Sequence, residues 1–290
     1  MKTKLIAILL LVLTCSMVSD KPAYLLFDKN GNLTSYEKLL IDASNADIIL
    51  FGELHDNPIC HWLELELTKD LYSIKKDQLV LGAEMFEADN QLLIDEFTSG
   101  KIKVSNFEAE AKLWPNYKTD YKPLLEFARK NKIPFKATNI PRRYASMVNK
   151  GGFEALDATD KEAKSFFAPL PIAYYADLNC YKKLLKIDSS AMVASHVTPN
   201  LPKAQAAKDA TMAHFILKNW NKGKVFLHYN GTYHSDDFES IVWYLKEDKP
   251  KLKILTISSI EQENMDTLSH EFINKADYIL CIPESMSKTH

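Results

Sequence analysis

The sequence predicts an α/β protein with a mostly parallel sheet flanked by helices and a smaller helical lobe inserted. Short runs of apolar and β-branched residues recur through the 290-residue chain, and most lack the in–out alternation of a half-buried strand. Segments with helical spacing lie between these runs. Strands and helices that alternate in this way are typical of parallel sheets covered on both faces. With 46% hydrophobic residues, the chain can bury a full core.

Six runs are expected to form strands, and three segments helices. The strand candidates are DIILFG (47–52), LVLGAEM (79–85), IPFKATN (133–139), KVFLHY (224–229), KILTIS (253–258) and YILCIP (278–283). One helix is expected after Pro58, where Leu63, Leu67 and Leu71 recur every fourth residue. Asn57 is a suitable N-cap and Pro58 a suitable first helical residue. The other two helices are expected over 203–220 and 237–247.

The segment from about 98 to 202 fits the alternation less well. It contains one good strand candidate, many aromatic residues and many lysines. We interpret its later part, around FFAPLPIAYYADLNCYKKLLK, as the helical lobe, at roughly 145–200. The expected organisation is therefore an export segment at 1–19, an α/β domain over 20–284 with this lobe inserted, and a polar tail at 285–290.

The N-terminal segment has the features of an export signal. Lys2 and Lys4 precede an apolar run, 5–13, that is too short to span a bilayer. Cys15 follows the run almost directly, which indicates a bacterial lipoprotein that is lipidated on Cys15. The alternative is ordinary secretion with cleavage near Ser19. The lipoprotein interpretation predicts an outer-membrane protein facing the periplasm or the surface, held to the membrane by its lipid anchor.

Charge and cysteine content exclude other classes. A formal net charge of −2 gives no reason to expect nucleic acid as a partner. Besides Cys15 the chain has Cys60, Cys180 and Cys281, without a CxxC spacing. Neither a disulfide framework nor a zinc knuckle is indicated, so we expect buried thiols.

Polar side chains that could carry chemistry follow four of the predicted strands. In open α/β sheets, ligands bind at the carboxyl ends of the strands. These positions hold Gly52, Glu53, His55, Asp56, Glu84, Glu87, Arg142, Arg143, Asn230, Gly231 and His234. The pattern Gly-x-x-His occurs twice, as GELH and GTYH, each time directly after a strand. The sequence therefore predicts a functional cleft to which His55, Glu84, Arg142 and His234 contribute.

This set of side chains permits two chemistries and one structural interpretation. His55, Glu84 and His234 could bind a divalent metal as two imidazoles and a carboxylate. The same residues could also perform general acid/base catalysis. In the structural interpretation, Asp56 and Asn57 only cap a helix, the histidines bond locally and Arg142 pairs with Glu84.

The motifs GELHDNP, GAEMFE, NIPRR, AQAAKDATMAH and NGTYHSD occur in an order that resembles the ChaN-like haem-binding uptake proteins of the Tiki superfamily. The resemblance runs from about Ala46 to Leu280. It implies a lipoprotein in iron or haem acquisition, with a large α/β domain, a small helical domain, and haem bound by a homodimer through a tyrosine. His55, Glu84, Arg142 and His234 map onto the cleft pattern of the superfamily. Asp209 lies on a predicted helix and could reach the cleft or remain on the helix surface.

No motif identifies the haem ligand directly. A phenolate suits ferric iron in an apolar slot. The aromatic lobe supplies Tyr174 and Tyr175 as candidate ligands, and His196 as a candidate second contact. Core or surface packing is the alternative role of each tyrosine.

Two functions therefore remain open. The first is a haem-binding lipoprotein that passes haem to or from an outer-membrane uptake receptor, for which a TonB-dependent receptor is the expected partner. The second is a metal-dependent hydrolase, similar to proteases and esterases of the superfamily, that uses the paired Gly-x-x-His cleft. No HExxH helix and no nucleophile elbow supports the second function.

Overall fold

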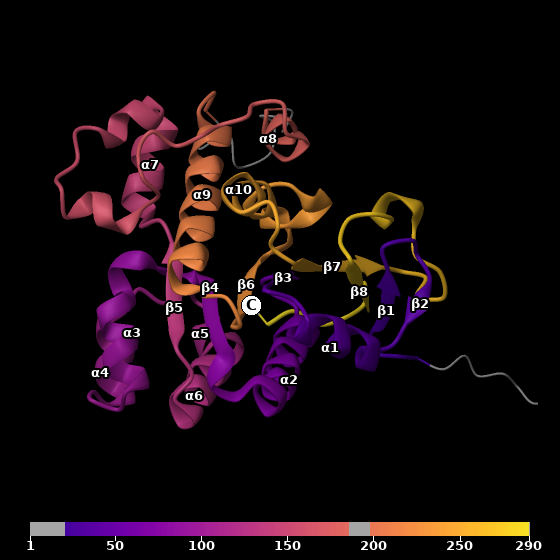
Figure 1. Cartoon of the computed structure of the whole chain (residues 1–290). Coiled ribbons are helices and arrows are strands. Elements are labelled where there is room, and N and C mark those ends of the chain that lie inside the picture. The colour runs from indigo at the N-terminus through magenta and orange to yellow at the C-terminus, as the bar shows by residue number, and fades with distance from the viewer. Residues whose placement is uncertain (1–20, 186–197, 290) are drawn as a thin grey trace, which may run out of the picture.

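The computed structural model describes residues 21–185 and 198–289, which form an eight-stranded sheet between two layers of helices (Figure 1). The strand order is β2-β1-β8-β7-β3-β6-β4-β5. All six predicted strands are confirmed, and they form the continuous parallel part of the sheet. Their bounds are β3 (Ile48–Glu53), β4 (Leu79–Glu87), β5 (Phe135–Asn139), β6 (Val225–Gly231), β7 (Ile254–Gln262) and β8 (Tyr278–Pro283).

Two further strands, which the sequence did not predict, extend the sheet beyond β8. They are β1 (Leu25–Asp28) and β2 (Leu33–Thr34), and both pair antiparallel. With four residues in β1 and two in β2, these strands are too short to show a clear hydrophobic pattern in the sequence.

Alternate residues of the central strands face the two helical layers. Ile49 and Phe51 of β3 pack against the first layer, whereas Ile48 and Leu50 pack against the second. The first layer contains α1 (Tyr36–Ser44), α2 (Pro58–Lys75), α3 (Gln91–Thr98), α4 (Val104–Glu110), α5 (Tyr117–Asp120) and α6 (Lys122–Asn131). The second contains α7 (Arg142–Gly151), α9 (Leu201–Asn219) and α10 (Ile241–Asp248). Burial on both faces explains the absence of alternation in the sequence.

Helix α2 begins as the sequence predicts. The Asn57 side chain accepts a hydrogen bond from the Ile59 backbone N–H at 3.0 Å, and Pro58 occupies the first turn. Asn57 is buried, and its amide also donates to Glu261 at the end of β7. The cap therefore fixes the turn that carries His55.

Regular structure is sparser than expected in two places. Helix α10 begins at Ile241 and not at residue 237, because Asp237, Phe238 and Ser240 all have positive φ angles. Between α7 and α9, the described residues (152–185 and 198–200) contain two short 3₁₀ turns and one short helix, α8 (Asn179–Leu184), joined by irregular chain. Pro169 and Pro171 lie in that irregular chain, which is consistent with the poor fit of proline inside helices.

The outer strand β5 is covered by a side chain from α3. The Gln91 amide donates to the Phe135 carbonyl at 3.1 Å and accepts from the Ala137 N–H at 2.8 Å. These two bonds imitate those of a neighbouring strand, so the backbone of β5 is partly satisfied on its free side.

None of the helices within the described ranges is long and apolar enough to cross a membrane.

We predict that Gly52→Ala destabilises the fold. A Cβ atom at Gly52 would lie 2.8 Å from the Ile257 carbonyl oxygen and 3.1 Å from Thr232 Cα, both of which are backbone atoms. The expected loss in the free energy of unfolding is about 1–3 kcal/mol, measured by urea denaturation. Gly151→Ala is the control, because its Cβ would approach only the Ala155 side chain, at 3.2 Å. Equal stability of the two variants would contradict the prediction.

Candidate active site

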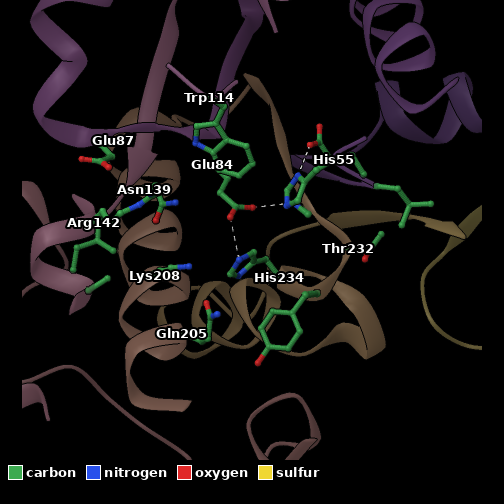
Figure 2. A pocket seen from close by; sticks show the side chains of 16 residues that line it. His55, Glu84, Glu87, Trp114, Asn139, Arg142, Gln205, Lys208, Thr232 and His234 are labelled. Carbon is green, nitrogen blue, oxygen red and sulfur yellow. Dashed lines mark hydrogen bonds and ion pairs between the residues drawn. The ribbon is translucent and has the colours of Figure 1, made fainter. Parts of the chain in front are cut away.

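The carboxyl ends of β3, β4 and β6 open into a cavity of about 480 Å³ that lies between the two Gly-x-x-His turns (Figure 2). Residues from the start of α7 and from α9 complete the wall. The lining residues are Glu53, Leu54, His55, Glu84, Glu87, Trp114, Asn139, Ile140, Arg142, Ala145, Gln205, Lys208, Gly231, Thr232, Tyr233 and His234. All four residues that the sequence placed in a cleft, His55, Glu84, Arg142 and His234, line this one cavity.

A chain of buried acid and imidazole groups forms one wall. Glu84 Oε1 lies 3.2 Å from His234 Nε2, and His234 Nδ1 lies 2.5 Å from Asp209 Oδ1. The Tyr181 hydroxyl donates to the other oxygen of Asp209 at 2.8 Å. Each ring nitrogen of His234 thus faces a carboxylate, which requires an N–H on both.

The pKa values agree with an imidazolium between two carboxylates. Burial alone would lower the pKa of His234, but Glu84 and Asp209 outweigh it and raise that pKa to about 9. Burial would raise the pKa of Glu84, yet His234 holds it well below its usual range. At neutral pH this wall therefore carries a positive ring beside the negative Glu84 carboxylate.

His55 also lines the cavity, beside the Gly231 turn, but in a different setting. Its Nδ1 lies 2.6 Å from Glu53 Oε1, which also accepts a hydrogen bond from the Tyr121 hydroxyl at 2.7 Å. Trp114 meets the imidazole edge-on, with 4.9 Å between ring centroids. Burial lowers the pKa of His55, but the bond to Glu53 outweighs this and raises the pKa overall. With Nδ1 bonded to Glu53, Nε2 is left for the cavity.

Close contacts around Gly231 explain why the second Gly-x-x-His motif begins with glycine. Its N–H donates to Glu84 Oε2 at 2.9 Å. A Cβ atom at this position would lie 2.8 Å from His55 Nε2. A side chain here would therefore displace His55 or fill the space beside it.

Two cations of the wall lack an acidic partner. Arg142 and Lys208 form no ion pair within 4.0 Å in the part of the chain that the structure describes, whereas Arg143 pairs with Asp89 at 2.5 Å. The buried Oε1 atom of Gln205 also has no hydrogen-bond partner. The structural interpretation expected Arg142 to pair with Glu84, and the structure shows no such pair. The two cations can bind an anionic group of a ligand.

The metal set inferred from the sequence does not assemble as expected. His55, Glu84 and His234 share the cavity, but the His234 nitrogens are both occupied by carboxylates. Across residues 21–185 and 198–289, the group whose ligand atoms all lie within 4.8 Å is instead Glu53, His61 and Glu64.

The candidate haem ligands lie away from the cavity. Tyr174 packs between Phe153 and Tyr181, and Tyr175 stacks on Trp243. Neither tyrosine lines the cavity. His196 and Cys15 fall outside the described residues.

Some functional positions could not be found by spacing alone. Tyr121 and Trp114 come from a segment without a motif, and Glu53, although its place after the strand was noted, received no role because it occupies a variable position of Gly-x-x-His. Lys208 had a usable signal, because it adjoins Asp209 on a predicted helix. Asp209 itself, which the sequence left open, is fully buried against His234.

Solved structures share this fold. The chain is similar to a solved structure of cofacial haem binding to ChaN of Campylobacter jejuni, with a TM-score of 0.65 and 19% identity, over 89% of this chain and 96% of that one. It is also similar to an erythromycin esterase in its open conformation, with a TM-score of 0.51 and 12% identity, over 88% and 94% of the two chains. At these identities the likeness concerns the fold.

Sequence comparison gives a relative and a family. The chain is 24% identical over 195 residues to the chloroplastic Protein RETICULATA-RELATED 5 of Arabidopsis thaliana, covering 63% of this chain and 25% of that protein. It thus spans about a quarter of that relative's length. The sequence pattern of the family described as "Haem-binding uptake, Tiki superfamily, ChaN" matches residues 39–245, well over half of the chain. The chain therefore belongs to the ChaN family of haem-binding uptake proteins in the Tiki superfamily.

Proposed function

We propose that the protein binds haem in the bacterial cell envelope and passes it to or from an outer-membrane uptake receptor. Membership of the ChaN family over residues 39–245 is the observation that carries this proposal. The same proposal includes three further elements: lipidation of Cys15, a TonB-dependent receptor as the partner, and a homodimer as the haem-binding form. The cofacial haem binding of the similar ChaN from Campylobacter jejuni supports the homodimer, because stacking two haems face to face is readily achieved between two copies.

Tyr175 is the better of the two candidate ligands. Tyr175 is 52% exposed, and its ring lies nearly parallel to the Trp243 ring. The two ring centroids are 6.5 Å apart and the angle between the ring planes is 12°. Tyr174 is half-buried, and burial raises the pKa of its hydroxyl. A phenolate ligand must be accessible to iron, and Tyr175 is the more exposed of the two side chains.

An apolar hollow near this tyrosine in sequence supports the same assignment. It has a volume of about 490 Å³, and its wall includes Ala173, Tyr244 and the α9 residues Ala210 and Ala213. Lys218, Lys249 and Asp248 also line it. An apolar surface with flanking cations suits a porphyrin face with its propionates.

We predict that haemin added to the purified chain gives a saturable Soret change. Tyr175→Phe should weaken haemin binding at least tenfold or shift the band, because it removes the phenolate oxygen while keeping the ring on Trp243. Absorbance titration measures both.

Tyr174→Phe is the matched control, with an expected titration like that of the unsubstituted chain. The absence of a saturable change in that chain would overturn the haem proposal. An unchanged Tyr175→Phe titration would overturn only the choice of ligand.

The cavity favours a second candidate function, hydrolysis by acid/base catalysis. His55 is held through Nδ1 by Glu53 and can accept a proton at Nε2 from an attacking water. Arg142 and Lys208 can hold an anionic group of the substrate. A carrier of haem alone has no evident use for this set of groups in one polar cavity. A metal-assisted mechanism with His234 as a ligand fits this cavity less well than acid/base catalysis, because both ring nitrogens of His234 already face carboxylates.

We predict that, if the cavity hydrolyses esters, His55→Gln reduces the rate by about 10²–10⁴-fold, the usual contribution of a general base. A panel of chromogenic carboxylic esters, including anionic ones, measures the rate. His214→Gln, outside this cavity, should retain full activity. Hydrolysis that survives His55→Gln would exclude His55 as the base.

We also predict a pH-dependent stability that depends on His234. Its folded pKa, about 9, is above the unfolded value of 6.5, so its stabilisation is complete below pH 6.5 and is lost between pH 6.5 and 9. The loss should be on the order of 2–3 kcal/mol in the free energy of unfolding. Denaturation across this pH range should show the decline in the unsubstituted chain and a flatter profile in His234→Gln. Identical slopes would contradict an imidazolium at this position.

A further inference from the structure

A second cluster of ionisable groups lies behind the wall that carries His55. Glu53, His61 and Glu64 are all buried, and His61 Nδ1 lies 3.2 Å from Glu64 Oε2 and 3.5 Å from Glu53 Oε2. Glu53 comes from the end of β3, and the other two residues come from successive turns of α2. Each residue offers one possible ligand atom, an imidazole nitrogen of His61 or a carboxylate oxygen of the two glutamates. These three atoms all lie within 4.8 Å of one another.

The hydrogen bonds of His61 orient its ring toward the two carboxylates. Its Nε2 lies 3.0 Å from the His55 carbonyl oxygen and 3.5 Å from Asp120 Oδ2. Both are acceptors, so Nε2 carries the proton and donates to the carbonyl. Nδ1 faces Glu64 and Glu53, and because lone pairs repel, either a proton or a cation must lie between this nitrogen and the two carboxylates. A histidine that donates one N–H to a carbonyl and offers the other nitrogen is the usual arrangement of a metal ligand.

The buried carboxylates are not compensated by the protein. Glu53 Oε2 and Glu64 Oε1 have no hydrogen-bond partner, although both side chains are at most 1% exposed. Within the described ranges, no lysine or arginine lies within 4.0 Å of Glu53, Glu64 or Asp120, whose ion-pair partners are histidines. Isolated buried charges of one sign are costly, so a cation or protons must neutralise them.

We propose that Glu53, His61 and Glu64 bind one divalent cation of the Zn²⁺ or Mn²⁺ class. One imidazole and two carboxylates suit these ions, and the separations of 3.2 and 3.5 Å fit ligands about 2.0–2.2 Å from a shared centre. Glu53 Oε2 faces the cluster while Oε1 holds His55 and Tyr121. The cation would therefore fix the carboxylate that orients His55.

The cluster adjoins the main cavity, because Glu53 belongs to the cavity wall as well as to the cluster. The proposal does not depend on haem, which would bind elsewhere on the chain. It concerns ligands other than the His55, Glu84 and His234 set considered from the sequence.

Metal binding to the full chain tests the proposal. After removal of metal with a chelator, Zn²⁺ or Mn²⁺ is titrated by calorimetry, and retained metal is counted by atomic emission. We expect one saturable site per chain. Glu64→Gln and His61→Gln should each weaken binding about 100-fold or more, since even residues that only orient ligands contribute 10–100-fold. Manganese bound at the site should also give an immobilised electron-resonance spectrum that both variants lose.

Glu66→Gln is the matched control on the same helix, because Glu66 pairs with Lys69 at 2.7 Å on the protein surface. It should bind metal like the unsubstituted chain. Thermal unfolding in chelator checks that each variant folds, and Glu64→Gln should be at least as stable there because it removes a repelling buried charge. The proposal is overturned if the unsubstituted chain binds neither ion saturably, which would show that protons neutralise the cluster. It is also overturned if a folded Glu64→Gln variant binds as tightly as the Glu66→Gln control.

Discussion

The hydrogen bond from the Gly231 N–H to the Glu84 carboxylate connects the parts of the cavity. It joins the end of β6 to β4, and it directs the second oxygen of Glu84 toward His234. Because Gly231 has no side chain, His55 from the neighbouring strand can lie against the same turn. The two Gly-x-x-His motifs therefore form one arrangement, in which each glycine permits the close approach that its neighbouring groups require.

Helix α9 connects this cavity with the region proposed for haem. Lys208 lines the cavity and Asp209 is buried against His234 of its wall, whereas Ala210 and Ala213 line the apolar hollow. Tyr181 of α8 donates to Asp209, so the segment that carries Tyr175 is bonded to the buried acid and imidazole chain. A haem carrier and an acid/base cavity can thus share one helix without sharing a ligand.

Periodicity predicts most of this fold, because both faces of the sheet are buried. Each of the six long apolar runs became a parallel strand, and the Asn57–Pro58 pair began α2 as expected. The cleft residues were predictable as well, since parallel strands bring their carboxyl ends to one edge. Contacts that depend on packing could not be predicted. Nothing near Tyr121 marks it as a partner of Glu53, and the positive φ angles before α10 leave no hydrophobic signature.

The two margins of the sheet limit how copies of this chain can associate. At one margin β2 contributes only two residues, and at the other the Gln91 amide already occupies backbone groups of β5. Among the described residues, neither margin offers a long row of free N–H and C=O groups onto which another strand could add. Self-association by continuing the sheet is therefore disfavoured relative to association through helices and irregular segments. Aggregation through strand exchange is suppressed by the same two features.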